Sequence, residues 1–172
     1  SSLHLKPASL NPWFQAMDET SGLKYTHTEN DYVDFKRQPL LPQVHSRNGP
    51  GIAVADVNGD GLEDFYIGGA RNDFGALFIQ NKNGFFINQK PVGSLHLNSA
   101  ALESDQMGVL FFDADNDQDQ DLYVATGGSE LDINADGYRD HLFINDGKGN
   151  FNEDQDALPL IKQSGSSVVA SD

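Results

Sequence analysis

Short apolar segments recur along the chain in two sets that can be aligned with each other. In the first set, apolar runs occupy residues 51–56, 64–69 and 76–81, and a turn at 82–84 leads to Phe86. In the second set, the runs occupy residues 108–113, 121–128 and 141–146, and a turn at 147–149 leads to Phe151. Glycine, asparagine and aspartate separate the runs, as in short β-strands joined by tight turns. The pattern therefore predicts an all-β chain with two similar units of four strands.

The first strand of these units begins again at the end of the chain. Residues 166–172 repeat its apolar pattern and end on Asp172, which aligns with Asp56 and Asp113. The spacings are 113 − 56 = 57 and 172 − 113 = 59 residues. Four-stranded antiparallel units repeated at about this length are typical of β-propeller blades. We predict an N-terminal lead-in at 1–50, a first blade at 51–106, a second blade at 107–165 and the first strand of a truncated third blade at 166–172.

An acidic segment of nine residues separates the first and second strands of each unit. Residues 56–64 read DVNGDGLED, and residues 113–121 read DADNDQDQD. Both segments place oxygen-bearing side chains at positions 1, 3, 5 and 9 and run directly into an apolar strand. Carboxylates this close together repel one another unless a cation lies among them, and Ca²⁺ takes about six to eight oxygen ligands. Two such segments in matching places predict two calcium-binding loops rather than two solvated turns.

A third segment, residues 132–140, fits the same spacing of oxygen-bearing side chains. It lies between the second and third strands of the second unit, where 141 − 121 = 20 residues replace the 76 − 64 = 12 of the first unit. Loops rich in Asn, Asp and Gly also connect strands without binding metal. The spacing makes this segment a candidate third calcium site, and its composition is equally consistent with a connecting loop.

An EF-hand would share the first part of these loops but needs flanking helices and a bidentate Glu at position 12. Position 12 is Ile67, Val124 or Phe143 here, and each of these lies inside a predicted strand. The sequence therefore excludes an EF-hand.

The composition and charge of the chain exclude several kinds of site and partner. The chain of 172 residues has no cysteine, 26 acidic and 11 basic residues, and a net charge of -15. The lack of cysteine excludes disulfides and thiolate metal sites. Because phosphate binding needs clustered basic residues and these are scattered, we expect no nucleic-acid partner. The sequence shows no transmembrane segment, and no signal peptide begins at Ser1, so we expect that an exported protein has lost its leader.

The sequence contains no recognisable catalytic motif. It has no Gly-x-Ser-x-Gly, His-Glu-x-x-His or phosphate-binding loop. The histidines are His4, His27, His45, His96 and His141. They form no pattern typical of acid–base catalysis, and we predict no catalytic residue.

Residues 51–69, GIAVADVNGDGLEDFYIGG, resemble an FG-GAP/VCBS repeat, and residues 145–151, NDGKGNF, are typical of its VCBS form. This resemblance covers residues 51–172. Residues 11–50 resemble the lead-in of bacterial proteins related to cartilage acidic protein, of the ASPIC/UnbV type. The resemblance implies calcium-bearing β-propellers like those of integrin α subunits, with about seven blades. We therefore expect the remaining blades to be partners of this segment, and the region around Trp13 and Phe14 to form an outer closing strand.

The resemblance also implies a set of ligands for each loop. Positions 1, 3, 5 and 9 of the family pattern ligate through side chains, and position 7 ligates through its backbone carbonyl. Carried over, the first site comprises Asp56, Asn58, Asp60, Leu62 and Asp64, and the second comprises Asp113, Asp115, Asp117, Asp119 and Asp121. The third candidate comprises Asp132, Asn134, Asp136, Tyr138 and Asp140. Gln118 replaces the usual glycine at position 6, which costs energy if the backbone there is left-handed.

The function implied by the resemblance is non-catalytic. We expect a calcium-binding β-propeller segment of an exported bacterial protein, located extracellularly, at the cell surface or in the periplasm. Its role would be adhesion or the binding of a protein or carbohydrate ligand at the cell surface. One alternative is the propeller part of a secreted or surface enzyme, a hydrolase or lyase. A nucleic-acid-binding protein is another, against which the acidic charge argues.

Overall fold

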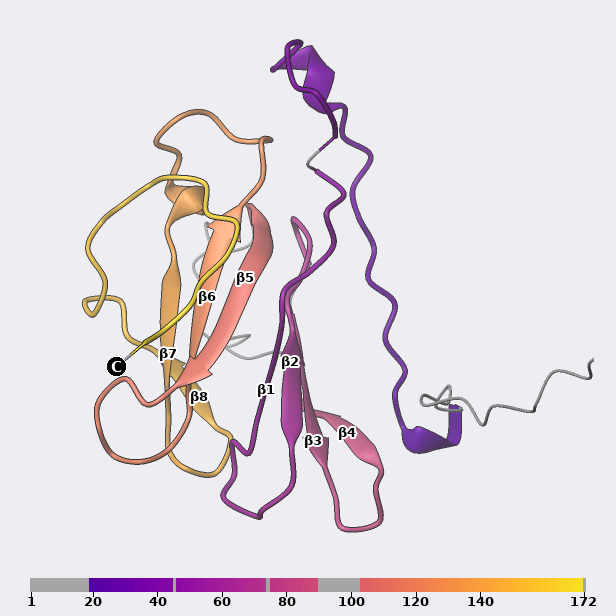
Figure 1. Ribbon diagram of the computed structural model, residues 1–172, viewed down its shortest axis with the longest axis vertical. Helices are drawn as coiled ribbons and strands as arrows, with labels where there is room; N and C mark the ends of the chain where they lie inside the picture. The colour runs from indigo at the N-terminus through magenta and orange to yellow at the C-terminus, as the bar shows by residue number, and fades with distance from the viewer. Residues whose placement is uncertain (1–18, 45, 74, 90–102, 172) are drawn as a thin grey trace, which may run out of the picture.

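The computed structural model describes residues 19–44, 46–73, 75–89 and 103–171. Within these residues the protein contains two four-stranded antiparallel sheets and no α-helix, which confirms the predicted all-β fold (Figure 1). No helix in this part of the chain is long and apolar enough to cross a membrane. The predicted closing strand around Trp13 and Phe14 lies outside the described residues, as do His4, His45 and His96.

The first sheet consists of β1 (Ile52–Ala55), β2 (Asp64–Ile67), β3 (Ala76–Gln80) and β4 (Phe86–Gln89), in that order. Each strand pairs with the next one along the chain, as expected when tight turns connect antiparallel strands. Ala53 lies opposite Tyr66, and Tyr66 lies opposite Leu77, so these three side chains share one face. All three are buried.

The second sheet repeats this order with β5 (Asp105–Phe112), β6 (Asp121–Gly127), β7 (His141–Asn145) and β8 (Phe151–Glu153). Its first strand begins three residues before the predicted run at 108–113, and its register shifts between Gln106 and Gly108. A 3-10 turn, η4 (Asp136–Tyr138), lies in the longer connection between β6 and β7. The strand boundaries otherwise follow the predicted runs closely.

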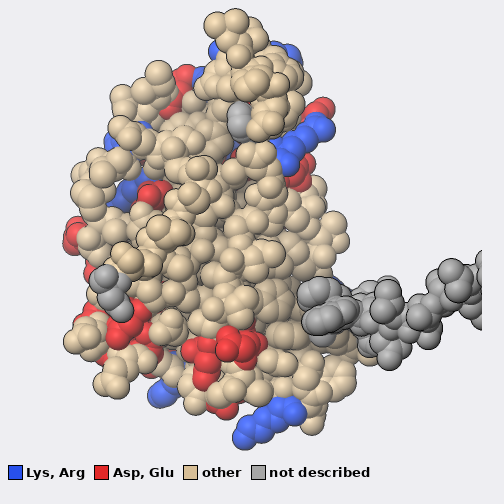
Figure 2. Space-filling model, in the orientation of Figure 1, with Lys and Arg blue, Asp and Glu red and all other residues tan. Residues whose placement is uncertain are grey.

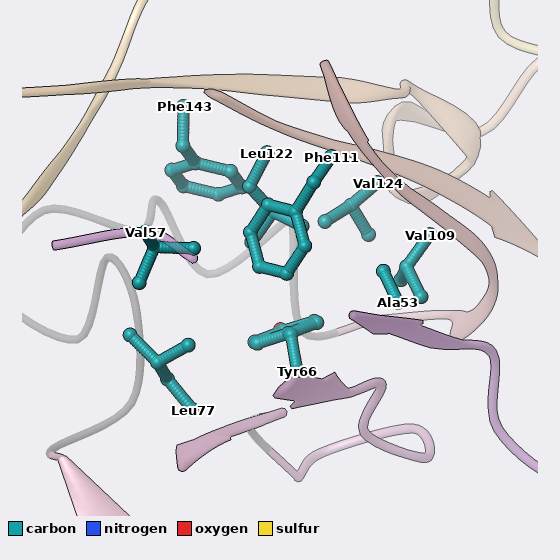
Figure 3. Packing of buried hydrophobic residues seen from close by; sticks show 9 residues of the cluster. All are labelled: Ala53, Val57, Tyr66, Leu77, Val109, Phe111, Leu122, Val124 and Phe143. Atoms are coloured by element: carbon teal, nitrogen blue, oxygen red, sulfur yellow. The ribbon is translucent and has the colours of Figure 1, made fainter. Parts of the chain in front are cut away.

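The core lies between the two sheets, where one face of each sheet packs against the other (Figure 3). The first sheet contributes Ala53, Tyr66 and Leu77, and the second contributes Val109 and Phe111 among others. The remaining labelled members are Val57, Leu122, Val124 and Phe143. Burial of these apolar side chains is the main force holding the sheets together.

The repeat identifies which face of a sheet packs in this way. Val109 and Phe111 are 9% and 8% exposed, whereas their counterparts 57 residues earlier, Ile52 and Val54, are 62% and 60% exposed. The face that β5 buries between the sheets is therefore the equivalent of the face that β1 exposes in the first sheet. Stacked blades of a β-propeller repeat one such interface around a ring.

Gln106 links the two sheets through polar contacts. Its backbone N–H donates to the carbonyl of Gly69 (2.9 Å), and its carbonyl accepts from the N–H of Gly51 (3.3 Å). Its side-chain Oε1 accepts from the hydroxyl of Tyr66 (2.7 Å) and from the N–H of Gly69 (2.9 Å). Gly165, 59 residues later, donates in the same way to the carbonyl of Thr126 (2.8 Å).

Residues 166–171 follow Gly165 but form no strand, although the sequence predicts the first strand of a third blade there. They run beside β5, where a Cβ atom on Gly108 would meet the Cα of Ser167 at 3.1 Å. A strand needs a hydrogen-bonded neighbour, and the predicted neighbour of this segment would belong to the third unit. The segment therefore lies next to β5, as β1 does, without being paired into a sheet.

The lead-in runs alongside the first sheet as an extended chain (Figure 1). It begins with η1 (Glu19–Ser21) and continues to η2 (Asp34–Lys36). Between them, Leu23, Tyr25, His27 and Glu29 are each half-buried and alternate with exposed residues. This alternation is that of a strand with one face turned toward the protein.

Candidate metal centre

The first acidic loop is folded around the side chain of its first residue. One carboxylate oxygen of Asp56 accepts the backbone N–H groups of Gly59 (2.8 Å) and Asp60 (3.2 Å). The other oxygen accepts the N–H of Gly61 (2.8 Å). Further along, Asp60 accepts the N–H of Leu62 (2.9 Å). These bonds hold the loop in a tight turn around the Asp56 carboxylate.

The second loop has the same internal bonds at the same positions. Asp113 accepts the N–H groups of Asn116 (2.7 Å), Asp117 (3.1 Å) and Gln118 (3.0 Å) through its two oxygens. Asp117 accepts the N–H of Asp119 (3.0 Å). Two segments that differ at several positions thus fold to one geometry, because positions 1 and 5 are aspartate in both.

The aspartate at position 9 joins each loop to its sheet. Asp64 and Asp121 are both 0% exposed. Asp64 accepts the N–H of Val57 (3.1 Å) with one oxygen and that of Gln80 in β3 (2.8 Å) with the other. Asp121 does the same with Ala114 (2.7 Å) and Asn145 in β7 (2.8 Å). Order in the loop is therefore coupled to order in the third strand.

The carboxylates of the second loop gather closely enough to hold one ion. Among the described residues, Asp113, Asp115 and Asp117 are the three acidic side chains whose oxygens lie within 4.8 Å of one another. In the first loop Asn58 takes the place of Asp115, so that loop carries one charge fewer there. Every side chain at these positions offers oxygen, which suits a hard cation such as Ca²⁺ and not a thiolate-bound metal.

Asp119 shows how strongly the carboxylates of the second loop repel one another. Its Oδ1 is buried and has no hydrogen-bond partner. Burial, together with the carboxylates of Asp117, Asp121 and Asp115, raises the pKa of Asp119 to about 6. A nearby cation would favour the charged form, because it offsets both the burial and the repulsion. The donor set of this loop therefore fits a bound cation.

Both loops lie at the same end of the molecule, where Figure 2 shows a gathering of acidic side chains. A hollow with a volume of about 480 Å^3 lies between the two loops and is lined by residues of both, including Asp56, Glu63, Gln118 and Asp119. Residues 56–124, which span both loops and most of the strands around them, match the family model of the FG-GAP-like repeat. The chain carries an FG-GAP-like repeat. No curated protein matches this sequence.

The FG-GAP match begins at the first residue of the first loop and ends inside β6. It supports the predicted family and, with the two sheets, a segment built like part of a β-propeller. Residues 11–50, which carry the resemblance to relatives of cartilage acidic protein, lie outside the matched range. That finer assignment stays a prediction.

Asn145 ties the two FG-GAP loops together, and sequence reasoning missed it. Its side-chain nitrogen donates to the carbonyl of Val57 in the first loop (2.8 Å) and to that of Gln120 in the second (3.1 Å). Its side-chain oxygen accepts the N–H groups of Asp146 (2.9 Å) and Gly149 (3.0 Å). The segment Asn-Asp-Gly is typical of a hairpin turn, and nothing in its composition indicates a contact 88 residues away.

The segment 132–140 does not reproduce the FG-GAP loop geometry, contrary to its spacing. Asp132 pairs with Arg37, and Asp136 pairs with Lys162. Asp140 accepts the hydroxyl of Tyr123 (2.7 Å) and the N–H of Thr126 (2.9 Å). The remaining predicted ligands are Asn134, which is exposed, and Tyr138, whose hydroxyl bonds to the backbone of Leu131. The insertion turns through η4 and its carboxylates bond to separate partners, so its geometry differs from that of the other two loops. A third calcium site there stays a prediction.

The two FG-GAP loops share a left-handed backbone at two positions. Gly59 and Gly61 have φ angles of 73° and 82°, and Asn116 and Gln118 have φ angles of 68° and 77° at the same places. Glycine adopts this conformation freely and asparagine tolerates it, whereas glutamine has a Cβ that clashes there. The predicted cost at Gln118 is therefore present.

We expect Gln118→Gly to stabilise the protein by about 1 kcal/mol, because it relieves the left-handed strain at position 6. Asn116→Gly is the matched control and should change stability less. The reverse change, Gly61→Gln, should destabilise through the backbone alone, since a Cβ on Gly61 meets no atom within 4 Å. Urea unfolding of the three variants measures these differences, and equal effects at 116 and 118 would contradict the explanation.

Proposed function

We propose that the two acidic loops bind Ca²⁺ and that the ions stabilise a β-propeller segment. The observation that carries this proposal is the matched folding of both loops around Asp56 and Asp113. The first ion would be held by Asp56, Asn58, Asp60, Asp64 and the carbonyl of Leu62. The second would be held by Asp113, Asp115, Asp117, Asp121 and the carbonyl of Asp119.

The chain's own residues would convert ion binding into fold stability. A bound ion neutralises carboxylates that otherwise repel one another in each loop. Asp64 and Asp121 hold the loop and the third strand of each sheet by hydrogen bonds from one side chain. Because the loop is ordered only in the folded chain, the free energy of binding adds to the free energy of folding.

Elemental analysis of the dialysed protein, paired with thermal melts in Ca²⁺ and in EGTA, tests this proposal. We expect two ions per chain and a lower melting temperature in EGTA. At a hundredfold excess of Ca²⁺ over its dissociation constant, one site stabilises the fold by about 2.7 kcal/mol. A protein that holds no calcium and melts at the same temperature in both buffers would overturn the proposal.

Variants of two acidic segments provide the control. Asp113→Asn combined with Asp115→Asn should remove one ion, because it takes two charges from the cluster of three carboxylates. Asp132→Asn combined with Asp136→Asn takes two charges from the segment that fits only by spacing, and it should leave the ion count unchanged. Loss of an ion in the second pair would show that residues 132–140 bind metal after all.

We further propose that the segment serves non-catalytic binding in an exported protein, at the cell surface or in the periplasm. Calcium outside cells is abundant enough to fill weak structural sites of this kind. The described histidines have carboxylate partners within the fold: His27 with Glu29 and His141 with Glu153, each at 2.6 Å. The proposed ligand is a protein or carbohydrate, and calcium-dependent retention on immobilised glycans tests the carbohydrate. Cleavage of a polysaccharide by the purified chain would instead favour the enzyme.

A further inference from the structure

The extended lead-in, residues 22–37, covers part of the outward face of the first sheet, the face turned away from the core. The ring of Tyr25 packs edge-on against Phe78 at 6.1 Å, and the Tyr25 hydroxyl donates to the carbonyl of Gly68 (3.3 Å). Gly22 lies so close to β4 that a Cβ there would meet the carbonyl oxygen of Phe86 at 2.2 Å. We call residues 22–37 the strap.

The repeat shows what the strap replaces. Phe78 and Phe143 hold the same place in β3 and β7, because they pair with Phe65 and Leu122 in the second strand of each sheet. Phe143 is buried in the core between the sheets, whereas Phe78 is buried on the face that the strap covers. The strap therefore stands where a further sheet would otherwise pack, and it leaves Ile52 and Val54 uncovered.

The far end of the strap is held by polar contacts to the connection between β6 and β7, where Glu130 lies. Tyr32 and Asp34 bond to Ser129, and Arg37 pairs with Asp132. The Glu130 side chain is only 3% exposed. Its two carboxylate oxygens accept from the amide of Asn30 (2.9 and 2.7 Å), and one also accepts from Arg71 (2.9 Å). Its carbonyl accepts from Arg37 (2.7 Å). One residue in this connection thus joins the strap to Arg71, in the connection between β2 and β3.

The polar contacts around Glu130 are incomplete. Glu29 Oε2, Asn30 Oδ1 and Arg71 Nε are buried and have no hydrogen-bond partner. Asp105 also lies here and accepts the N–H of Arg71 (2.9 Å); burial and the carboxylates of Glu29 and Glu130 raise its pKa to about 6. Buried polar atoms without partners weaken a network, whereas the core between the sheets is apolar. The strap is therefore held less strongly than the two sheets are held to each other.

We propose that residues 22–37 form a releasable strap over the outward face of the first sheet, with Glu130 as the clasp that keeps it closed. Opening would uncover Phe78 next to the already exposed Ile52 and Val54, creating a continuous apolar surface. Glu130 lies in the connection between β6 and β7, and its partner Arg71 lies in the connection between β2 and β3, so both are separate from the acidic loops. Its opening does not depend on whether those loops hold calcium.

Two spin labels measure the opening directly, because the chain has no cysteine of its own. Thr26→Cys in the strap and Asn88→Cys in β4 are exposed positions that place one label on each side of the contact. Their distance distribution should be narrow in the parent chain and broad once the strap opens. With Glu130→Ala, the open fraction should rise about ten- to a hundredfold, because a buried charged acceptor of several bonds is lost.

Glu153→Ala is the matched control, since Glu153 has an 8% exposed side chain paired with His141 and no described contact with the strap. It should leave the distance distribution narrow. If Glu130→Ala does not fold, Asn30→Ala removes the same bonds from the strap side and should broaden the distribution alone. A narrow distribution in the folded clasp variants, or equal broadening with Glu153→Ala, would overturn the proposal. Results that differ between Ca²⁺ and EGTA would contradict its independence from the loops.

Discussion

Replacing Asn145 with alanine is expected to lower the free energy of unfolding by about 4 kcal/mol. The side chain is 5% exposed and makes four hydrogen bonds to backbone groups. Each bond contributes about 1 kcal/mol, and buried groups left without a partner cost more. The substitution would leave the carbonyls of Val57 and Gln120, one in each acidic loop, without this hydrogen-bond donor. Urea unfolding monitored by circular dichroism measures the loss.

Gln80 provides the matched control for this experiment. It holds the same place in β3 that Asn145 holds in β7, because its backbone N–H also donates to the position-9 aspartate of its loop. Its half-buried side chain makes no such pair of bonds between the loops within the described residues. Gln80→Ala should therefore cost less than about 1 kcal/mol. Similar losses at both positions would show that the strand position matters and the tie between the loops does not.

Most of the fold could be predicted from the sequence because its signals are local. Alternating apolar runs and Asn/Asp/Gly turns predict each hairpin of the two sheets, and the internal repeat places them in corresponding order. The two ends of the described chain were harder to predict. Residues 166–171 have the apolar pattern of a strand but no described sheet to join, and the strap alternates like a strand while bonding mainly through side chains.

The fold of the acidic loops was predictable only in part. The spacing of acidic residues picked out two segments that fold alike, and calcium binding by them stays a prediction. The left-handed backbone at Gln118 meets the condition under which the sequence predicted an energetic cost. For residues 132–140, the spacing does not reveal that Arg37 and Lys162 approach Asp132 and Asp136 from other parts of the chain, and a calcium site there stays a prediction. Contacts across the two sheets, such as those of Asn145 and Glu130, depend on the stacking and leave no local signal.

Replacing Gln106, which links the two sheets, is expected to cause the second large loss of stability. Gln106→Leu is expected to cost about 3 kcal/mol, because it removes the acceptor shared by the Tyr66 hydroxyl and the Gly69 N–H. Tyr66 is 2% exposed, so water cannot replace that acceptor. Tyr66→Phe alone should cost about 1 kcal/mol, since Gln106 keeps its bond to Gly69.

A double-mutant cycle separates this link from simple loss of packing. Once Tyr66→Phe has removed the stranded hydroxyl, Gln106→Leu should cost at least about 1 kcal/mol less than it does alone. Tyr123 is the matched control, because it is the counterpart of Tyr66 in the second sheet and its hydroxyl donates to Asp140. Gln106→Leu should therefore add to Tyr123→Phe without coupling. Coupling to both tyrosines, or to neither, would mean that the side chain of Gln106 holds the sheets together by filling space, and that the bond to Tyr66 contributes little.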